Sequence, residues 1–203
     1  MAESMSFEAN DAGLILRRPL VSAVLAGRGD ALVVTGLGSA TYDAAAAGDH
    51  DANFYYWGGM GLTAMTGLGV AMAQPDRRVL VITGDGDMMM GVGSFTTIAA
   101  KAPANLGILV LDNEQFGETG EQAGLSGGKA NLEEMARGAG FEHTMTVDGS
   151  GDPSKVLQLM YETAGPTLCV AKVAKGNEKR ILPSLDGAYL ARRFRDTIGV
   201  QNP

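Results

Sequence analysis

The sequence predicts an α/β fold in which helices cover both faces of a doubly wound parallel sheet. Short runs made almost wholly of Val, Ile and Leu, such as RVLVITG at 78–84 and LGILVLDN at 106–113, are typical of strands buried on both faces. Segments with apolar residues at helical spacing alternate with these runs. The 29 glycines punctuate the short elements and form no repeat or low-complexity tract. We therefore expect one domain over 1–203, with 176–203 as a C-terminal helical tail.

The predicted elements follow one another along the whole chain. Strands are predicted at 31–36, 78–84, 106–113, 143–147 and 166–173, and 53–57 is either a further strand or an extended loop. Helices are predicted at 12–27, where Pro19 should disturb the middle, and at 61–74, 88–102, 131–140, 152–165 and 183–199. The segment 61–74 has small and apolar residues all round, so it should be buried or packed closely on both sides.

Two of these helices carry terminal signals. Asn131 is a good N-cap for the helix at 131–140, which should end at Gly138 or Gly140. Asp152 should cap the helix at 152–165, with Pro153 at its first position.

Composition excludes several classes of protein. No apolar run approaches the ~20 residues that a membrane span needs. The N-terminal segment is acidic before it is apolar, the reverse of a secretory signal, so a cytoplasmic location is expected. A net charge of -7 argues against nucleic-acid binding, and the basic residues of ARRFRD at 191–196 fit a solvated helix face. The single cysteine, Cys169, excludes a disulfide framework and a cysteine-ligated zinc or iron-sulfur site, and fits a buried small hydrophobe.

The stretch TGDGDMMMG at 83–91 raises the main functional question. Gly84 and Gly86 can adopt conformations closed to other residues and can approach a ligand closely. Asp85 is then an oxygen donor at the end of a buried strand, and a helix starting near Met88 would offer free N–H groups to an anion. An acid beside an anion site suits a divalent cation such as Mg²⁺ between them. The alternative is that Asp85 only caps its helix.

The spacing to the next loop favours the metal site. Twenty-five residues separate Gly86 from Asp112, enough for one helix and one strand, so both loops should return to the same edge of the sheet. Asp112, Asn113 and Glu114 then supply further oxygen atoms near Asp85.

The motif GDG, followed after about 25 residues by a pair ending in Asn113, resembles the thiamine diphosphate and magnesium signature of the thiamine-dependent enzymes. The upstream segment NFYYWGGMGLTAMTGLGVAMA is similar to the part of these enzymes that holds the thiazole and aminopyrimidine rings. The resemblance covers roughly residues 10–175 and corresponds to the diphosphate-binding half of the family. It is nearest to the small subunits of sulfopyruvate decarboxylase and the matching half of phosphonopyruvate decarboxylase.

The resemblance implies roles for individual residues. Magnesium would be bound by Asp85, the side-chain carbonyl of Asn113 and the main-chain carbonyl of Gln115. The N–H groups of Gly86 and Asp87 would meet the diphosphate, while Gly58 would accept from the pyrimidine amino group and Met60 would wedge beneath the cofactor. The remaining cofactor-binding positions that it implies are Gly36, Gly38, Ser39, Gly84, Phe116 and Gly117, although the glycines at 36–39 could serve only a turn.

Two positions depart from the family. Asp87 stands where Ser, Cys or Ala is usual, and its carboxylate would repel diphosphate unless it points away or caps the helix. Asp112 replaces the first Asn of the usual pair, a position that does not bind the metal.

The loop at 116–129 would cover the substrate. Glu118, Thr119 and Gln122 resemble the polar positions of that loop in the family, and the resemblance makes them the candidate catalytic residues. Lys129 is either a partner for a sulfonate or phosphonate group or simply exposed ahead of a helix. A surface or packing role fits His50 and His143.

The family implies a partner and a reaction. The glutamate that ionises the cofactor belongs to a pyrimidine-binding (PYR) domain that 203 residues cannot also contain, so a separate alpha subunit should supply it in an α2β2 or larger assembly. The apolar helix at 61–73 is a candidate contact surface. The expected reaction is non-oxidative decarboxylation of a small anionic 2-oxo acid. A carboligase of the acetolactate synthase kind and a cofactor-binding module without catalysis stay open as alternatives, whereas a ferredoxin-linked oxidoreductase would need its cluster elsewhere because Cys169 stands alone.

Overall fold

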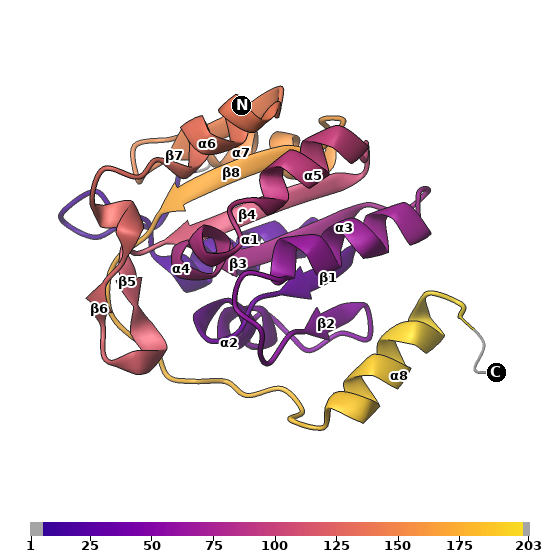
Figure 1. Cartoon of the computed structure of the whole chain (residues 1–203). Helices are drawn as coiled ribbons and strands as arrows, with labels where there is room; N and C mark the ends of the chain where they lie inside the picture. Colours follow the sequence, from indigo (N-terminus) through magenta and orange to yellow (C-terminus); the bar gives the residue numbers. More distant parts are fainter. Residues whose placement is uncertain (1–5, 201–203) are drawn as a thin grey trace, which may run out of the picture.

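A six-stranded sheet, parallel throughout, forms the centre of the molecule. The computed structural model describes residues 6–200, and its strands follow the order β2-β1-β3-β4-β8-β7 (Figure 1). The predicted α/β class is confirmed, and the segment at 53–57 supplies a short edge strand. The strands of this sheet are β1 (Leu32–Thr35), β2 (Asn53–Tyr55), β3 (Val79–Gly84), β4 (Leu106–Asp112), β7 (His143–Val147) and β8 (Thr167–Lys172).

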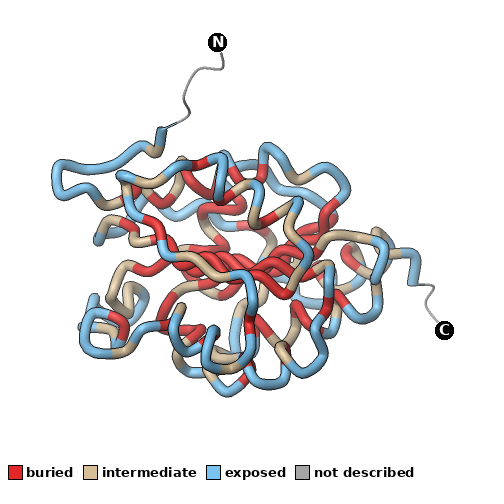
Figure 2. The backbone as a smooth tube through the Cα atoms, turned by 90° about the horizontal axis from the view of Figure 1, so that it is seen from above, coloured by how far each residue is buried: buried red, intermediate tan, exposed pale blue. Residues whose placement is uncertain are grey.

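Helices cover both faces of the sheet, which lies as a buried band between two outer layers (Figure 2). Alternate residues of each strand enter opposite cores: Leu80 and Ile82 of β3 join one cluster, whereas Val79 and Val81 join the other. The first cluster includes residues of α1 (Arg17–Ala26), α2 (Ser39–Ala46) and α7 (Pro153–Tyr161). The second includes residues of α3 (Thr63–Ala73), α4 (Asp85–Met90), α5 (Ser94–Lys101) and α6 (Leu132–Ala139).

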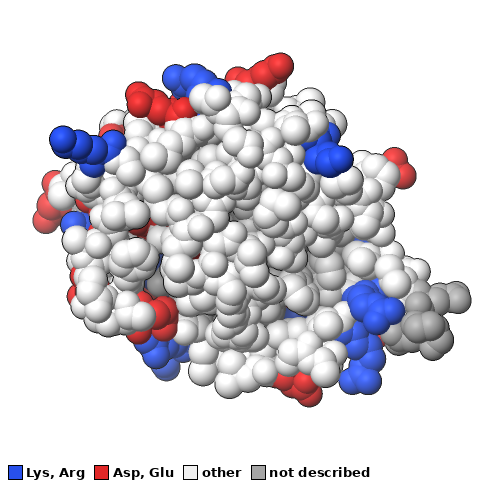
Figure 3. All heavy atoms as spheres, viewed as in Figure 1, with Lys and Arg blue, Asp and Glu red and all other residues white. Residues whose placement is uncertain are grey.

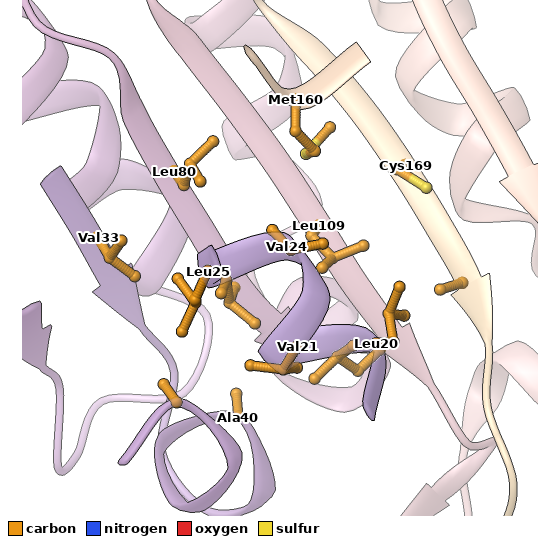
Figure 4. Packing of buried hydrophobic residues seen from close by; sticks show 14 of the residues in the cluster. Leu20, Val21, Val24, Leu25, Val33, Ala40, Leu80, Leu109, Met160 and Cys169 are labelled. Carbon is orange, nitrogen blue, oxygen red and sulfur yellow. The ribbon is translucent and has the colours of Figure 1, made fainter. Parts of the chain in front are cut away.

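Helix α1 shows how the first cluster is packed. Leu20, Val21, Val24 and Leu25 point from one side of the helix toward the sheet, where side chains of β1, β3, β4 and β8 meet them (Figure 4). Each of these side chains is at least nine-tenths buried. Burying a side chain of this size contributes about 1.5–3 kcal/mol, so α1 is fixed firmly against the sheet.

The C-terminal helix α8 (Gly187–Thr197) covers the sheet edge at β2 (Figure 1). Leu190 enters the first core cluster and Phe194 the second, so α8 closes the edge from both sides. The expectation of a solvated basic face is wrong for Arg193, whose side chain is 8% exposed and donates to Asp49 at 2.8 and 3.1 Å. The partner is available because α8 lies beside the loop that precedes β2.

Two predicted helices differ from those observed. Pro19 does not disturb α1, because the helix begins at Arg17 and the proline lies in its first turn, where backbone N–H groups have no partner within the helix. The segment 88–102 is two helices rather than one: α4 begins at Asp85 and ends at Gly91, and α5 starts at Ser94. The residue at this break must be glycine, since a Cβ at Gly91 would collide with the carbonyl oxygen of Gly61.

The predicted terminal signals of α6 and α7 are confirmed. Asn131 accepts a hydrogen bond from the N–H of Glu134, and α6 ends at Gly140 in the left-handed conformation. Asp152 accepts from the N–H of Ser154, with Pro153 as the first helical residue.

Within residues 6–200 we find no helix that combines the length and hydrophobicity needed to cross a membrane.

Cys169 should be chemically inert in the folded protein. Its side chain is fully buried in β8, and burial raises the pKa of its thiol to about 12. Because the thiolate is the reactive form, we expect no alkylation by iodoacetamide at pH 8, and complete alkylation once the chain is unfolded in guanidinium chloride. Mass spectrometry of both samples checks this, and rapid labelling of the native protein would contradict it.

Candidate functional site

A cleft lies at the carboxyl edge of the sheet, where the strand order changes direction. From β1 the chain passes through α2 to β2 on one side, whereas β3 lies on the other side of β1 and leads to β4. Such a switch point is the usual ligand site of an open α/β sheet. Figure 1 shows α2, α4 and the hairpin of β5 (Gln115–Phe116) and β6 (Gln122–Ala123) gathered at the end toward which the strands point.

Most residues that the sequence singled out line this cleft. They come from the loops after three neighbouring strands and from the segment before α3. They are Gly38 and Ser39 after β1; Met60; Gly84, Asp85, Gly86 and Asp87 after β3; and Asn113, Gln115, Phe116, Gly117, Glu118 and Thr119 after β4.

Four other residues lie outside the cleft lining. Gly36 has its N–H bonded to Ile82 and its carbonyl bonded to Thr41, so its main chain is occupied within the protein. Gly58 and Lys129 are exposed. Gln122 braces the loop, because its side chain donates to the carbonyl of Thr119 and accepts from the hydroxyl of Thr119, each at 2.8 Å.

Asp85 is a buried acid at the base of the cleft. It is 2% exposed and its Oδ2 accepts from the hydroxyl of Ser126 at 2.6 Å. Burial raises the pKa of Asp85, an effect that the Ser126 hydrogen bond opposes and the nearby Asp112 carboxylate reinforces. No side chain caps the N-terminus of α4, and Asp85 occupies its first turn. A carboxylate raised in energy in this way would be stabilised by a cation in the cleft.

The loop after β4 brings Asn113 and Gln115 to the same cleft. Glu114 between them has φ 59°, a left-handed conformation that turns the chain sharply, and the Oδ1 of Asn113 accepts from the N–H of Gln115 at 3.0 Å. The acids on either side are neutralised elsewhere, because Lys172 donates to Asp112 at 2.9 Å and to Glu114 at 2.7 Å. Hydrogen bonding to Lys172 lowers the pKa of Glu114.

Asp87 faces away from the cleft centre and binds groups of the protein. Its Oδ1 accepts from the N–H of Gly61 at 2.5 Å, and its Oδ2 accepts from the hydroxyl of Thr63 at 2.6 Å and from that of Thr83. The carboxylate is 6% exposed, with Gly36 close behind it. The carboxylate of Asp87, which the sequence suggested would repel diphosphate, is therefore bound by three donors inside the fold.

The glycines of the GDG motif provide space rather than unusual backbone angles. The conformations that only glycine adopts easily are not used here, because Gly84 has φ -91° and Gly86 is not among the residues of positive φ. A Cβ on Gly86 would lie 2.7 Å from the ring of Phe116 and 3.6 Å from the Met60 methyl group. A Cβ on Gly84 would meet no atom within 4 Å, so this side of the turn is open toward the cleft.

Two helix N-termini meet the cleft without a side-chain cap. Gly38, at φ 74°, precedes α2, and Gly84 precedes α4. Uncapped N–H groups at helix starts bind anions readily. A hard anion beside a buried carboxylate requires a cation between them, and Asp85, the Asn113 amide and the Gln115 carbonyl are the oxygen types that Mg²⁺ prefers. Within the described range no group of three or more His, Cys, Asp or Glu could hold a metal, so carboxylates alone do not form a site.

Some residues of the site were missed from the sequence. Arg17, Leu37, Ala40 and Leu111 also line the cleft, and Ser126 binds Asp85. A signal for Arg17 exists, since a pair of arginines interrupts the apolar segment LILRRPLV. Ser126 carries no comparable signal, because it is one of several small polar residues in a glycine-rich loop.

Comparison with known proteins gives one consistent result. Residues 36–171 match the family model "Thiamine pyrophosphate enzyme, C-terminal TPP binding domain". The chain is 38% identical over 167 residues to phosphonopyruvate decarboxylase of Streptomyces viridochromogenes, covering 82% of this chain and 42% of that protein. It is 32% identical over 167 residues to sulfopyruvate decarboxylase subunit beta of Methanocaldococcus jannaschii, covering 82% of this chain and 88% of that one. The solved thiamine diphosphate-dependent 4-hydroxybenzoylformate decarboxylase of Rhodococcus jostii shares the fold, with a TM-score of 0.65 at 21% identity over 88% of this chain and 36% of that one.

Removing the carboxylate of Asp87 should destabilise the fold. Asp87→Ala leaves the N–H of Gly61 and the hydroxyls of Thr63 and Thr83 without their acceptor, so we expect the free energy of unfolding to fall by about 3 kcal/mol or more. Urea denaturation measures this. Asp76→Ala, at an exposed aspartate, is the control and should change the free energy by less than about 0.5 kcal/mol. Equal stability of the two variants would contradict the interpretation.

Proposed function

Residues 36–171 show that the chain belongs to the thiamine pyrophosphate enzymes, since they match the family's TPP binding domain. We propose that the chain is the diphosphate-binding subunit of a thiamine diphosphate- and magnesium-dependent 2-oxo acid decarboxylase. The observation that carries the proposal is the cleft at the strand switch point, where a buried carboxylate meets two uncapped helix N-termini. The relatives support the reaction class, since their names are those of decarboxylases.

The polar end of the cofactor would lie at the base of the cleft. Asp85, the side-chain carbonyl of Asn113 and the main-chain carbonyl of Gln115 would bind Mg²⁺, and the N–H groups at the starts of α2 and α4 would donate to the diphosphate. Gly84 leaves room for that approach. The inward orientation of Asp87 removes the repulsion expected of a second acid beside diphosphate.

The apolar part of the cleft would receive the rings. Met60 and Phe116 both reach Gly86, so their side chains border the space above the GDG turn. A methionine can adapt its shape to a bound ring, and an aromatic side chain excludes water from it. Thiamine diphosphate, when bound, supplies the carbanion that adds to the ketone of a 2-oxo acid and accepts the electrons left by carbon dioxide.

The substrate would enter beneath the loop after β4. Glu118 and Thr119 line the cleft mouth, and Gln122 holds Thr119 in place. The names of the relatives favour a 2-oxo acid with a second anionic group, such as a sulfonate or phosphonate.

A second subunit should complete the active site. The chain spans 42% of the length of the Streptomyces decarboxylase. Another relative is named as a beta subunit, and this name supports the proposal of a PYR-domain alpha subunit that supplies the catalytic glutamate. Figure 3 shows a broad uncharged face over α3, α4 and α5, with charged side chains confined to its rim. Leu62, Met72 and Met90 are each at least half exposed near this face, which suits a contact surface for the alpha subunit in an α2β2 assembly.

Cofactor binding should depend on Asp85. We expect thiamine diphosphate with Mg²⁺ to raise the melting temperature of the wild-type chain, since a ligand at a hundred times its Kd stabilises by about 2.7 kcal/mol. Asp85→Asn should abolish this rise because it removes the only charged metal ligand. Differential scanning fluorimetry measures both, with the exposed Asp76→Asn as control. An undiminished shift in Asp85→Asn would refute the metal assignment.

The purified chain alone should show no turnover. Co-purification from the native host, followed by assays with pyruvate, sulfopyruvate and phosphonopyruvate, should recover carbon dioxide release only in the complex, with one of the doubly anionic acids preferred. Full activity without any partner would contradict the two-subunit proposal. Formation of acetolactate as the product would favour a carboligase.

A further inference from the structure

Arg17 is a buried cation at the cleft that has no part in the roles proposed above. Its side chain is 6% exposed and it lines the cleft. Its Nε donates to the Oδ2 of Asp43, but across residues 6–200 neither Nη atom donates a hydrogen bond to the protein. A guanidinium has five N–H donors, so the outer edge of this one is available to a ligand.

The chain places Arg17 at the cleft by pairing the residues before α1 with the sheet. The N–H of Ile15 donates to the carbonyl of Lys172, the last residue of β8, and Ile15 accepts from the N–H of Ala174. Helix α1 begins directly after this pairing, at the carboxyl edge of the sheet. The position of Arg17 is therefore set by main-chain bonds and by the packing of α1, and little side-chain freedom is left to lose on binding.

Arg17 shares its carboxylate partner, Asp43, with a second arginine. Asp43 is fully buried and accepts from two arginines, Arg17 and Arg18, the second at 2.9 Å. Arg18 also lies 3.7 Å from Glu178, so two carboxylates balance the two arginines, and Asp43 occupies only the Nε of Arg17. Arg18 lies farther out, 21% exposed, and also donates to the carbonyl of Lys179.

Among the described residues that line the cleft, Arg17 is the one basic side chain, and the acids are Asp85, Asp87 and Glu118. Two of these acids already have partners within the protein. Glu118 accepts from Tyr42 and pairs with Arg180, each at 3.2 Å, and Asp87 binds its three internal donors. The cleft thus presents one acid, Asp85, to a cation and one base, Arg17, to an anion.

We propose that the guanidinium of Arg17 binds the diphosphate group of the cofactor through its Nη atoms. The inference rests on the proposed function, because it assigns a further residue to the same site. Arginine binds phosphate oxygens with two parallel hydrogen bonds, and the anion would lie between Arg17 and the uncapped start of α2, whose Gly38, Ser39 and Ala40 share the cleft lining. The arginine would offset the negative charge that Mg²⁺ and Asp85 together leave on the diphosphate.

The test measures binding of inorganic diphosphate with Mg²⁺ to the full chain by isothermal titration calorimetry. Arg17→Gln should weaken binding at least tenfold, and Arg17→Lys should weaken it less, because the charge is kept while the second hydrogen bond is lost. Arg18→Gln is the matched control, since it removes the other arginine on Asp43 and should change the affinity by less than twofold.

Each other outcome has a definite meaning. If the wild-type chain fails to bind Mg²⁺ with diphosphate, the proposed function is overturned and the inference with it. If the wild type binds and the Arg17 variants bind equally well, the inference alone is wrong. Equal losses in the Arg17 and Arg18 variants would assign both residues to support of Asp43, which also overturns the inference.

A parallel titration with methylphosphonate tests binding of the substrate's anionic group. If the Arg17 variants bind methylphosphonate more weakly but diphosphate as well as the wild type does, Arg17 is assigned to the substrate instead. Circular dichroism checks that each variant is folded. Should Arg17→Gln be unfolded, the affinity of Arg17→Lys decides the test.

Discussion

The hydrogen bonds of Asp87 hold together the segments on which the cleft depends. This one carboxylate joins the end of β3 at Thr83, the first turn of α4 and the entry to α3 at Gly61 and Thr63. A buried charge is tolerated only when donors surround it, so these segments must keep their relative positions. The close backbone contact of Gly91, the C-cap of α4, with Gly61 reinforces the arrangement. Met60 is consequently held beside the GDG turn.

The same turn explains why one of its two acids is available for a ligand. Successive helical residues are rotated by about 100°, so Asp85 and Asp87, two positions apart in α4, project to nearly opposite sides of the helix. Asp87 enters the protein and meets three donors, whereas Asp85 faces the cleft and has one hydroxyl partner, Ser126. Because Asp85 and Asp87 are two positions apart in α4, Asp87 stabilises the fold and Asp85 is left as a candidate metal ligand.

The sequence allowed the fold and the floor of the site to be predicted because both depend on local patterns. Runs of Val, Ile and Leu indicated the strands, and the 25-residue spacing placed Asp85 and Asn113 at one edge. The orientation of Asp87 could not be predicted, since its donors lie up to 26 residues away and meet it only after packing. For Arg17 the pair of arginines in an apolar segment is a signal, but its closeness to the cleft follows from the pairing of Ile15 with Val173, which no local pattern indicates.

The distribution of charge in the cleft fits a chain that binds the cofactor's polar end and, as proposed above, relies on a second chain for the catalytic glutamate. Asp85 and Arg17 present opposite charges across the base of the cleft, an arrangement suited to a metal and its phosphate ligands. Toward the GGMG segment the polar groups give way to Met60 and to Gly58, which is exposed. Among the described cleft residues, the ionisable group next to this segment is Asp87, whose carboxylate is already occupied by the N–H of Gly61 and the hydroxyls of Thr63 and Thr83. A reaction that develops charge on the cofactor rings needs a free ionisable group there. The uncharged face over α3 and α4 lies next to this segment, so the proposed second subunit, docked on it, could supply such a group without disturbing Asp85 or Arg17.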